Sequence, residues 1–417
     1  MVTMPPKAAM SMRPLAAVTL ALLILSVPAS AAAISIPNLI PASPSITQGQ
    51  ATQVFAGGVS GGTAPYSYQW YVKPPGSAVY VASTNASLSS YGCIVTYLQP
   101  MRLVFVAGIG ADQGTYDFRV VVSDSSSDTA NSSVAGINVT SYNATWPSAS
   151  NTGVPAGTVL APINASSGYV YGQYGPSDDY VIDSVFIYGP IHLYGESADP
   201  FNNITFQRFA TEYLGYNNVD YEDLGIFFEY VNHTTLRQCT LNGSSIGTGT
   251  PEAYLTMEGC NVFNVGDMKI RTGFVIQNNY IHNLTNLGHG EDIYLVDGSG
   301  AQVRHNNLVA QNPSTASAAL YTEGLGSSVT NATVDDNLLN GGAYCMSGSG
   351  TGPPYINGTF NPYSPPINEI ATNNHFGTQI ASQCGGYGPV GDIFNYSYPF
   401  VWVGNVWNAT NAPLAYP

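Results

Sequence analysis

Charged residues are scarce in this sequence. Its 417 residues include ten Lys and Arg and 25 Asp and Glu, so that 8% of the chain is charged, against about 25% in ordinary soluble domains. The formal net charge is −15 at pH 7, and the ten basic residues do not cluster along the chain. Unaided binding to nucleic acid is therefore excluded, because it requires grouped Lys and Arg side chains that displace counterions from phosphates.

Long hydrophobic runs are also missing. Leu15–Val27 is an apolar run of about 13 residues, whereas a membrane span takes about 20. Lys7 and Arg13 precede this run and the small residues Ala29–Ala31 follow it, which predicts a signal peptide over residues 1–31 and an extracellular or cell-surface protein. An uncleaved anchor is the alternative. No later segment is apolar enough to span a membrane.

Amide and hydroxyl side chains take the place of charge. The chain carries 44% hydrophobic and 12% aromatic residues, enough for a folded core. Thirteen Asn residues begin N-x-S/T triplets, the acceptors of N-linked glycans in exported proteins. Some arise by chance in a chain rich in Asn, Ser and Thr, but together they predict a glycosylated surface protein. The thirteen are Asn85, Asn131, Asn138, Asn143, Asn164, Asn203, Asn232, Asn242, Asn283, Asn331, Asn357, Asn395 and Asn408.

Residues 35–141 are predicted to form a β-sandwich. Stretches such as "YSYQWYV" and "GTYDFRVVVSD" are rich in aromatic and β-branched residues and are separated by Gly, Pro and Ser turns. With Trp70 and the turn Asp112–Tyr116, the segment resembles an immunoglobulin-like domain with a tyrosine corner. It lacks the cysteines of antibody-type domains, so the resemblance is to disulfide-free modules that act as spacers or adhesive units on microbial surface proteins.

An imperfect repeat fills residues 168–417, after a predicted linker over residues 142–167. Its copies include "FVIQNNYIHN", "QVRHNNLVA" and "TVDDNLLNG", and units of 19 to 37 residues made of strands and turns indicate a solenoid. Aligning the copies places one residue of each at a shared turn. These residues are Phe209, Cys239, Cys260, Asn279, Asn307, Asn337, Asn374 and Asn405.

The repeated Asn turn, preceded by inward Val, Ile, Leu and Phe, resembles the right-handed parallel β-helix of the pectate-lyase-like superfamily. The resemblance implies an all-β chain, an immunoglobulin-like sandwich followed by a solenoid. It does not imply one activity, because the superfamily includes lyases, hydrolases, epimerases, tailspikes and adhesins. The stacked Asn side chains are expected to bond to one another and to backbone amides.

The five cysteines can be interpreted on these coils. Cys239 and Cys260 share the ladder position on neighbouring coils, within disulfide range. Cys345 and Cys384 also fall on neighbouring coils, so both pairs are predicted disulfides, with buried free thiols as the open alternative for the first pair. Cys93 is left alone. No pair has the spacing to His of a zinc site.

Ionisable residues collect on consecutive coils between residues 269 and 323. Counting back ten residues from the ladder gives Glu229, Lys269 and Asp297, and aligning "ALYTEGLG" with "IYLVDGSG" brings Glu323 over Asp297. Two stacked carboxylates flanked by Lys269 could raise one pKa for acid–base catalysis or share a cation. A polysaccharide lyase also uses a basic group beside carboxylates, to abstract a proton next to the carboxylate of a uronate sugar. The alternative is a solvated ladder of alternating charges.

Further candidates lie in two other segments. "NLGHGEDIYLVDG" carries His289 and Asp292 and resembles, with one inserted residue, the H-x-D strand entry of bacterial extracellular β-helix proteins of uncharacterised function. It lacks the other motifs of polygalacturonases. The aromatic side chains near the C-terminus, Trp402, Trp407 and Tyr387, could form a sugar-stacking platform or cap the solenoid.

Three functions remain open at this stage. The first is a secreted or cell-surface glycoprotein whose β-helix binds polysaccharide or another cell surface. The second is a polysaccharide lyase or glycoside hydrolase using Lys269, His289, Asp292, Asp297 and Glu323, and the third is a structural envelope component. No cofactor is required, calcium is possible, and the oligomeric state is open. The low charge also suggests an acidic habitat, where carboxylates are protonated.

Overall fold

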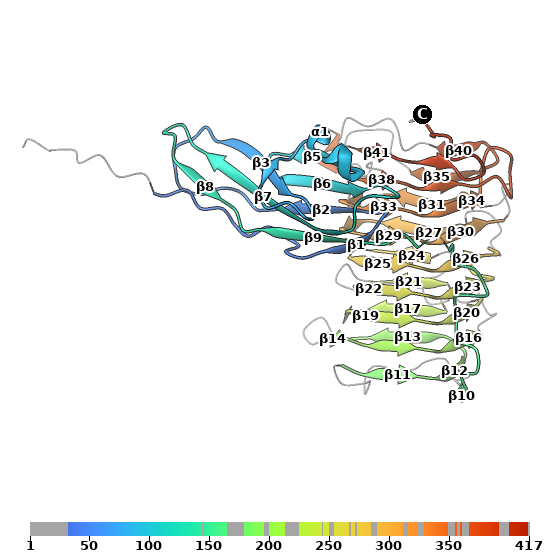
Figure 1. Ribbon diagram of the computed structural model, residues 1–417. Helices are drawn as coiled ribbons and strands as arrows, with labels where there is room; N and C mark the ends of the chain where they lie inside the picture. Colours follow the sequence, from blue (N-terminus) through green and yellow to red (C-terminus); the bar gives the residue numbers. More distant parts are fainter. Residues whose placement is uncertain are drawn as a thin grey trace, which may run out of the picture.

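The protein is described by a computed structural model and is almost entirely made of β-strands (Figure 1). Its only described helical residues are α1 (Asn85–Leu88) and the 3-10 turn Ser89–Tyr91. The predicted signal peptide lies outside the described residues. These are 32–143, 145–164, 179–195, 200–212, 225–243, 245–249, 254–266, 268–271, 273–284, 290–311, 316–323, 329–348, 355–356, 359–360, 367–391 and 400–415.

Two antiparallel sheets make up the N-terminal part. A three-stranded sheet runs β2 (Ala51–Phe55), β6 (Arg102–Ala107), β5 (Cys93–Gln99). The larger sheet runs β1 (Ser45–Thr47), β9 (Ala135–Thr140), β7 (Gly114–Ser123), β3 (Ser67–Lys73), β4 (Val81–Ala82), with β8 (Thr129–Asn131) also on β7. Their inward residues form one core that includes Trp70, Phe105, Tyr116 and Phe118. The Tyr116 hydroxyl donates to Asp112 O at 2.8 Å.

Three long parallel sheets of ten, nine and eight strands build the rest of the chain, an arrangement consistent with a parallel β-helix. The ten-stranded sheet contains β10 (Ala161–Asn164), β12 (Val185–Tyr188), β16 (Ala210–Glu212), β20 (Thr240–Asn242), β23 (Asn261–Phe263), β26 (Tyr280–His282), β30 (Asn307–Ala310), β34 (Leu338–Gly341), β39 (His375–Phe376) and β42 (Val406–Trp407). Since β10 pairs with β12, the solenoid already begins within the predicted linker.

The nine- and eight-stranded sheets complete each coil. The nine-stranded sheet contains β11 (Val181–Asp183), β15 (Thr205–Gln207), β19 (Thr234–Arg237), β22 (Leu255–Glu258), β25 (Phe274–Gln277), β29 (Gln302–Arg304), β33 (Thr333–Asp335), β38 (Ile370–Thr372) and β41 (Val401–Val403). The eight-stranded sheet contains β13 (Ile191–Tyr194), β17 (Ile226–Glu229), β21 (Ile246–Thr248), β24 (Met268–Ile270), β27 (Glu291–Val296), β31 (Ala318–Glu323), β35 (Tyr344–Gly348) and β40 (Gly388–Gly391).

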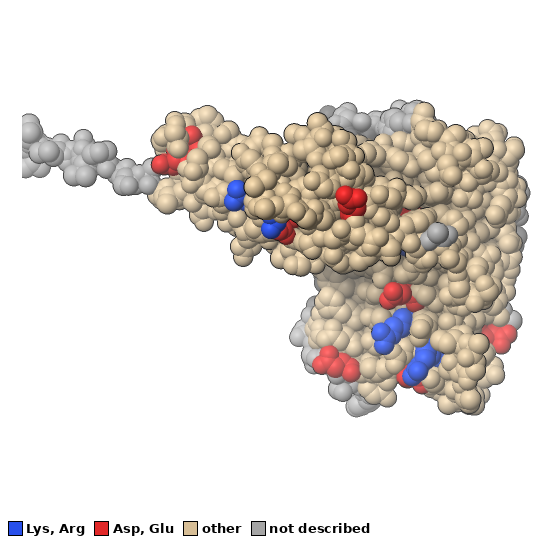
Figure 2. All heavy atoms as spheres, in the orientation of Figure 1, with Lys and Arg blue, Asp and Glu red and all other residues tan. Residues whose placement is uncertain are grey.

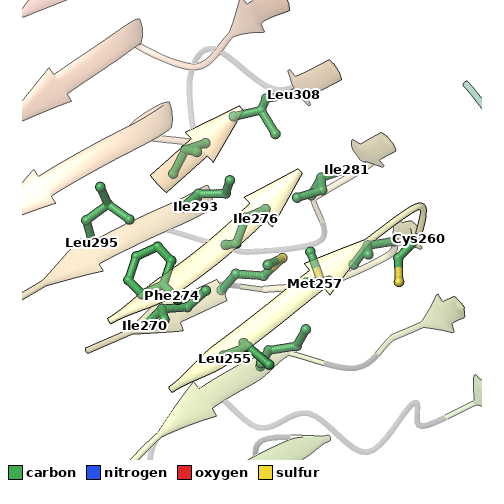
Figure 3. Close-up of a cluster of buried hydrophobic side chains, with 14 of the residues drawn as sticks. Leu255, Met257, Cys260, Ile270, Phe274, Ile276, Ile281, Ile293, Leu295 and Leu308 are labelled. Atoms are coloured by element: carbon green, nitrogen blue, oxygen red, sulfur yellow. The ribbon is translucent and has the colours of Figure 1, made fainter. Parts of the chain in front are cut away.

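Short strand pairs extend the turns between these sheets. They are β14 (Phe201–Asn202) with β18 (Val231–Asn232), β28 (Gly298–Ser299) with β32 (Val329–Thr330), and β36 (Tyr355–Ile356) with β37 (Thr359–Phe360). Inside the coils, side chains such as Met257, Ile276 and Leu308 stack into a single core (Figure 3).

A buried Asn ladder marks the turn from the nine- to the ten-stranded sheet. The side-chain oxygen of Asn337 accepts from the backbone N–H of Asn306 at 3.0 Å, and its amide donates to Val303 O at 2.9 Å. The predicted ladder is wrong in one copy, where Asn306 rather than Asn307 takes the position. In that copy His305 has the left-handed conformation (φ 48°), so the next residue enters the ladder and Asn307 starts β30.

Both predicted disulfides are present. Cys239 and Cys260 continue the ladder column and are joined across neighbouring coils, with their Cα atoms 4.5 Å apart. Cys345 and Cys384 form the second disulfide, with a Cα separation of 5.8 Å. Cys93 is free and buried, and burial raises the pKa of its thiol to about 11.

The N-terminal sheets dock sideways on the later coils of the solenoid (Figure 1). Ala51, Val104 and Val106 pack against Ile370 and Val401 in a separate apolar cluster. The chain then runs back along the outside of the solenoid over residues 145–160. Pro147 O accepts from Asn307 Nδ2 at 2.9 Å, and Gly153 N donates to Gly259 O at 2.8 Å. The two parts therefore share one continuous set of contacts.

Candidate functional site

An outward row on the eight-stranded sheet brings together the predicted residues Lys269 and Glu323. Ile270, Ile293 and Leu295 point into the core (Figure 3). Because strand side chains alternate, the neighbouring residues Lys269 and Tyr294 face outward. Lys269 is paired with Tyr294 and Tyr294 with Tyr321 on the next strand.

The side chains of this row contact one another. Lys269 Nζ lies 5.3 Å from the centre of the Tyr294 ring, within the range of a cation–π interaction. The Tyr294 and Tyr321 rings meet edge to face, with centroids 5.4 Å apart. The Tyr294 hydroxyl donates to the Glu323 carboxylate. We call Lys269, Tyr294, Tyr321 and Glu323 the tyrosine row.

Burial, followed by the bond to Glu323, raises the pKa of Tyr294 above its ordinary value. Its hydroxyl therefore stays protonated across the physiological range and acts as a hydrogen-bond donor. The row presents two neighbouring aromatic rings, with Lys269 over one of them and Glu323 at its hydroxyl, and all four side chains are partly exposed.

The predicted stacking of Asp297 and Glu323 is wrong by one residue. Glu323 is paired with Val296, and Asp297 lies just beyond the strand in a left-handed turn (φ 51°). The Asp297 backbone N–H donates to Glu323 O at 3.1 Å, so the residues are neighbours without sharing a column. The cause is the same slip as in the ladder, because Asn306 rather than Asn307 takes the ladder position, and ten residues before Asn306 is Val296.

The remaining predicted catalytic residues do not join the row. Asp292 is fully buried at 0% exposure, and neither carboxyl oxygen has a hydrogen-bond partner in the described part of the chain. Burial, with a further contribution from Glu291, raises its pKa well above the ordinary value. His289 lies outside the described residues. Glu229 is paired with Tyr194, on coils that precede Lys269.

More aromatic side chains continue the outward face toward the first coils. His192, Tyr194 and Phe227 form a cluster with ring centroids 5.7 to 6.1 Å apart. Phe227 is paired with Gly247, and Gly247 with Lys269. The aromatic cluster and the tyrosine row therefore follow one line across consecutive strands.

The C-terminal tryptophans pack at the end of the solenoid. Trp402 lies close to Phe376 and Phe400, with ring centroids 5.9 and 6.1 Å from its own. Its indole N–H donates to Leu414 O at 3.0 Å. Trp407 also packs against the core. This favours the capping interpretation for both. Tyr387 is 76% exposed and so is accessible to a ligand. Its ring centroid lies 6.0 Å from that of Tyr344.

A second charged cluster, which the sequence did not reveal, lies under the N-terminal sheets. Asp335 forms an ion pair with Arg304 at 3.1 Å and accepts from Ala51 N at 2.5 Å. Beside it, Asp336 is bonded to His305 at 2.8 Å. Both carboxyl groups are completely buried, so this cluster joins the two parts of the molecule and is closed to large ligands. We call these four side chains the interface cluster.

Surface charge elsewhere is sparse, as Figure 2 shows for one face. In the part of the chain that the structure describes, no three His, Cys, Asp or Glu residues are arranged to hold a metal ion. None of the described helices is long and apolar enough to cross a membrane. No family model matches this chain, and no curated protein matches its sequence.

Proposed function

We propose that the protein is exported and binds polysaccharide along the outward face of the eight-stranded sheet. The tyrosine row is the observation that carries this proposal. Sugar rings have apolar C–H faces that pack on aromatic side chains, while their hydroxyl groups bond to polar and charged groups at the ring edges. Lys269 and Glu323 both contact Tyr294, one over its ring and the other at its hydroxyl.

The finer fold assignments belong to the same proposal. The three sheets support a right-handed β-helix of the pectate-lyase-like kind. The bond from Tyr116 to Asp112 O supports an immunoglobulin-like sandwich, because a tyrosine corner has this contact. In such a protein the sandwich would hold the solenoid away from the surface that carries it.

A lyase or hydrolase is the second candidate. Tyr294 contacts both Lys269 and Glu323, so a base, a hydroxyl donor and a carboxylate lie within one small area. Two observations favour binding over catalysis: Asp292 is buried, and Asp297 is out of register with Glu323. A purely structural envelope role would leave the tyrosine row without a ligand.

The experiment incubates the protein with polygalacturonate, alginate, xylan and mannan. Absorbance of unsaturated ends and release of reducing sugar report turnover, and retardation in gels that contain the same polymers reports binding. We expect retardation without turnover, and a loss of affinity of about tenfold or more for Tyr321→Ala. Tyr188→Ala is the matched control, since Tyr188 is exposed on another sheet. Turnover abolished by Glu323→Ala would establish the enzyme instead, and absence of any binding would reject both.

Glycosylation is expected only where the Asn amide is available. Asn85, Asn131 and Asn143 are exposed on the N-terminal part and should be occupied. Asn331 should not, because its amide donates to Ser299 Oγ and its oxygen accepts from Arg102 in the docking interface. Glycopeptide mass spectrometry of protein secreted by a glycosylating host tests this. An occupied Asn331 in the folded protein would contradict it. Asn357 and Asn395 lie outside the described residues.

A further inference from the structure

A cleft opens in the N-terminal part, far along the chain from the tyrosine row. It has a volume of about 640 Å³ and lies where β3, the end of β5 and the segment after β4 meet. β4 and β5 are edge strands of the two N-terminal sheets, so the cleft forms where the sheets part. Its volume falls in the range of about 300 to 1,000 Å³ that small-molecule sites have.

Aromatic side chains line this cleft. Trp70 is 3% exposed, and its indole N–H donates to Pro100 O at 2.9 Å, which holds the ring in place. Tyr97 is 44% exposed; its hydroxyl donates to Ser83 O and so spans from β5 to the segment after β4. Tyr68 packs against the same core. The rings are therefore ordered before any ligand arrives.

Uncharged polar groups accompany the rings. Ser83 is 1% exposed, and its hydroxyl has no hydrogen-bond partner in the described part of the chain. An unpaired buried hydroxyl costs free energy unless a ligand or water satisfies it. Gln99 also lines the cleft and is exposed, so its amide can donate to and accept from hydroxyl groups.

No charged side chain lines the cleft. Lys73 is paired with Asp117 at 2.6 Å, and Arg119 lies over the Tyr80 ring at 4.2 Å. Because side chains alternate along β3, Lys73 faces the side opposite to Trp70. A charged ligand would thus be desolvated in the cleft without a counter-charge, which excludes acidic sugars and phosphates.

We infer that this cleft is a second saccharide site, which binds a short segment of a neutral glycan against Tyr97. The bond between Tyr97 and Ser83 O fixes the ring, and Gln99 and Ser83 supply hydrogen bonds to sugar hydroxyls. The N-terminal part is then a binding module as well as a spacer. Two sites on one docked molecule increase the avidity for a surface that displays both glycans.

The test is calorimetric titration of the full chain with cellohexaose, laminarihexaose, xylohexaose and mannohexaose. We expect at least one of these neutral oligosaccharides to bind, and Tyr97→Ala to weaken that binding by about tenfold or more. Tyr97→Phe keeps the ring and should retain most of the affinity. Tyr80→Ala, on the other side of the sheet, is the matched control and should bind like the wild type.

Two results would overturn the inference. One is that none of the four oligosaccharides binds the wild type, and the other is that Tyr97→Ala and Gln99→Ala both bind with unchanged affinity. Gln99 is exposed, so its variant carries the test if Tyr97→Ala fails to fold, as judged by thermal melting. Lys269→Ala with Tyr321→Ala should leave this binding intact, so the failure of the solenoid proposal would be seen separately.

Discussion

Arg304→Ala is expected to loosen the N-terminal part from the solenoid and to destabilise the protein by about 3 to 5 kcal/mol. The Arg304 side chain is 10% exposed and that of Asp335 is 0% exposed. Removing one partner of a buried ion pair leaves the other charge uncompensated, which has a cost of this size. Arg304 Nη2 also donates to Ala51 O at 2.8 Å, so the substitution removes a bond between the two parts.

The ion pair between Arg304 and Asp335 bonds to a single residue of β2, Ala51. Asp335 accepts from Ala51 N, and Arg304 donates to Ala51 O. The pair thus bonds to both the backbone N–H and the backbone C=O of Ala51, where β2 crosses the outside of the nine-stranded sheet. Ile370 and Val401 next to it supply the apolar part of the contact, so we expect loosening rather than complete loss of the docked arrangement.

Thermal melting and amide hydrogen exchange measure this effect. Exchange in β2 and β33 should increase in Arg304→Ala, and the double variant Arg304→Ala with Asp335→Ala should recover part of the loss. Arg237→Ala is the matched control, because Arg237 occupies the same column of the nine-stranded sheet on an exposed coil. Exposed ion pairs and hydrogen bonds contribute little. Equal melting temperatures for the two arginine variants would contradict this account of the interface.

Folding stability should be greatest in acid and should fall as the pH rises from about 5 to 9. Burial raises the pKa of Asp335 to about 6 in spite of Arg304, and that of Glu369 to about 8. It also raises the pKa of Asp292 and Asp336. A carboxyl group with a raised pKa binds its proton more tightly in the folded state, so its contribution is complete at low pH and is lost as the pH passes the folded pKa.

Two buried histidines, His305 and His375, modify this dependence of stability on pH in opposite directions. Burial alone would lower the pKa of His305, but its bond to Asp336 and the charge of that residue raise it overall. His305 therefore adds to the stability at low pH. Burial lowers the pKa of His375, which opposes the trend below about pH 6.5. Tyr142 also contacts Asp336 and stays neutral, because burial raises its pKa.

Glu369→Gln isolates one of these contributions. Both carboxyl oxygens of Glu369 are buried without a partner in the described part of the chain. Each pKa unit is equivalent to about 1.4 kcal/mol, so the rise from 4.5 to about 8 corresponds to at most about 5 kcal/mol. Denaturant melts between pH 3 and 9 should show a flatter alkaline limb for this variant, and an unchanged profile for the partly exposed control Glu258→Gln.

The opposite dependence of stability on pH would contradict the idea that the low charge is an adaptation to an acidic habitat. Stability that rises from pH 4 to 8, or loss of folding at pH 2 to 3, would show that the pKa values of these carboxyl groups are not raised in the folded state. The expected profile instead supports the hypothesis that the protein works in an acidic habitat. There, its few basic residues limit repulsion between like charges once the carboxyl groups are protonated.

The repeat allowed much of the solenoid to be predicted from the sequence, because each coil reuses one turn. The ladder positions of Asn279, Asn337 and Asn374 and both disulfides follow from that periodicity. The same periodicity could not resolve the doublet Asn306–Asn307, since each residue stands two positions before an apolar one, Leu308 or Val309. Only the left-handed conformation of His305 decides which Asn enters the ladder.

The candidate site was predicted less completely, for a physical reason. Lys269 and Glu323 were expected on one face and are found there, but Tyr294 and Tyr321 between them look like ordinary strand residues in the sequence. A slip of one residue then moved Asp297 out of the column. The interface cluster could not be predicted, because Ala51 and Asp335 are distant along the chain and no periodic pattern links the two parts.

Amide hydrogen exchange in the presence of polysaccharide tests the central claim most directly. The full chain is compared alone and with each of polygalacturonate, alginate, xylan and mannan, and protection is mapped to peptides. The account predicts that at least one polymer slows exchange in β24, β27 and β31, which carry the tyrosine row, and that Tyr321→Ala abolishes this protection. Unchanged exchange in these three strands with all four polymers would contradict it.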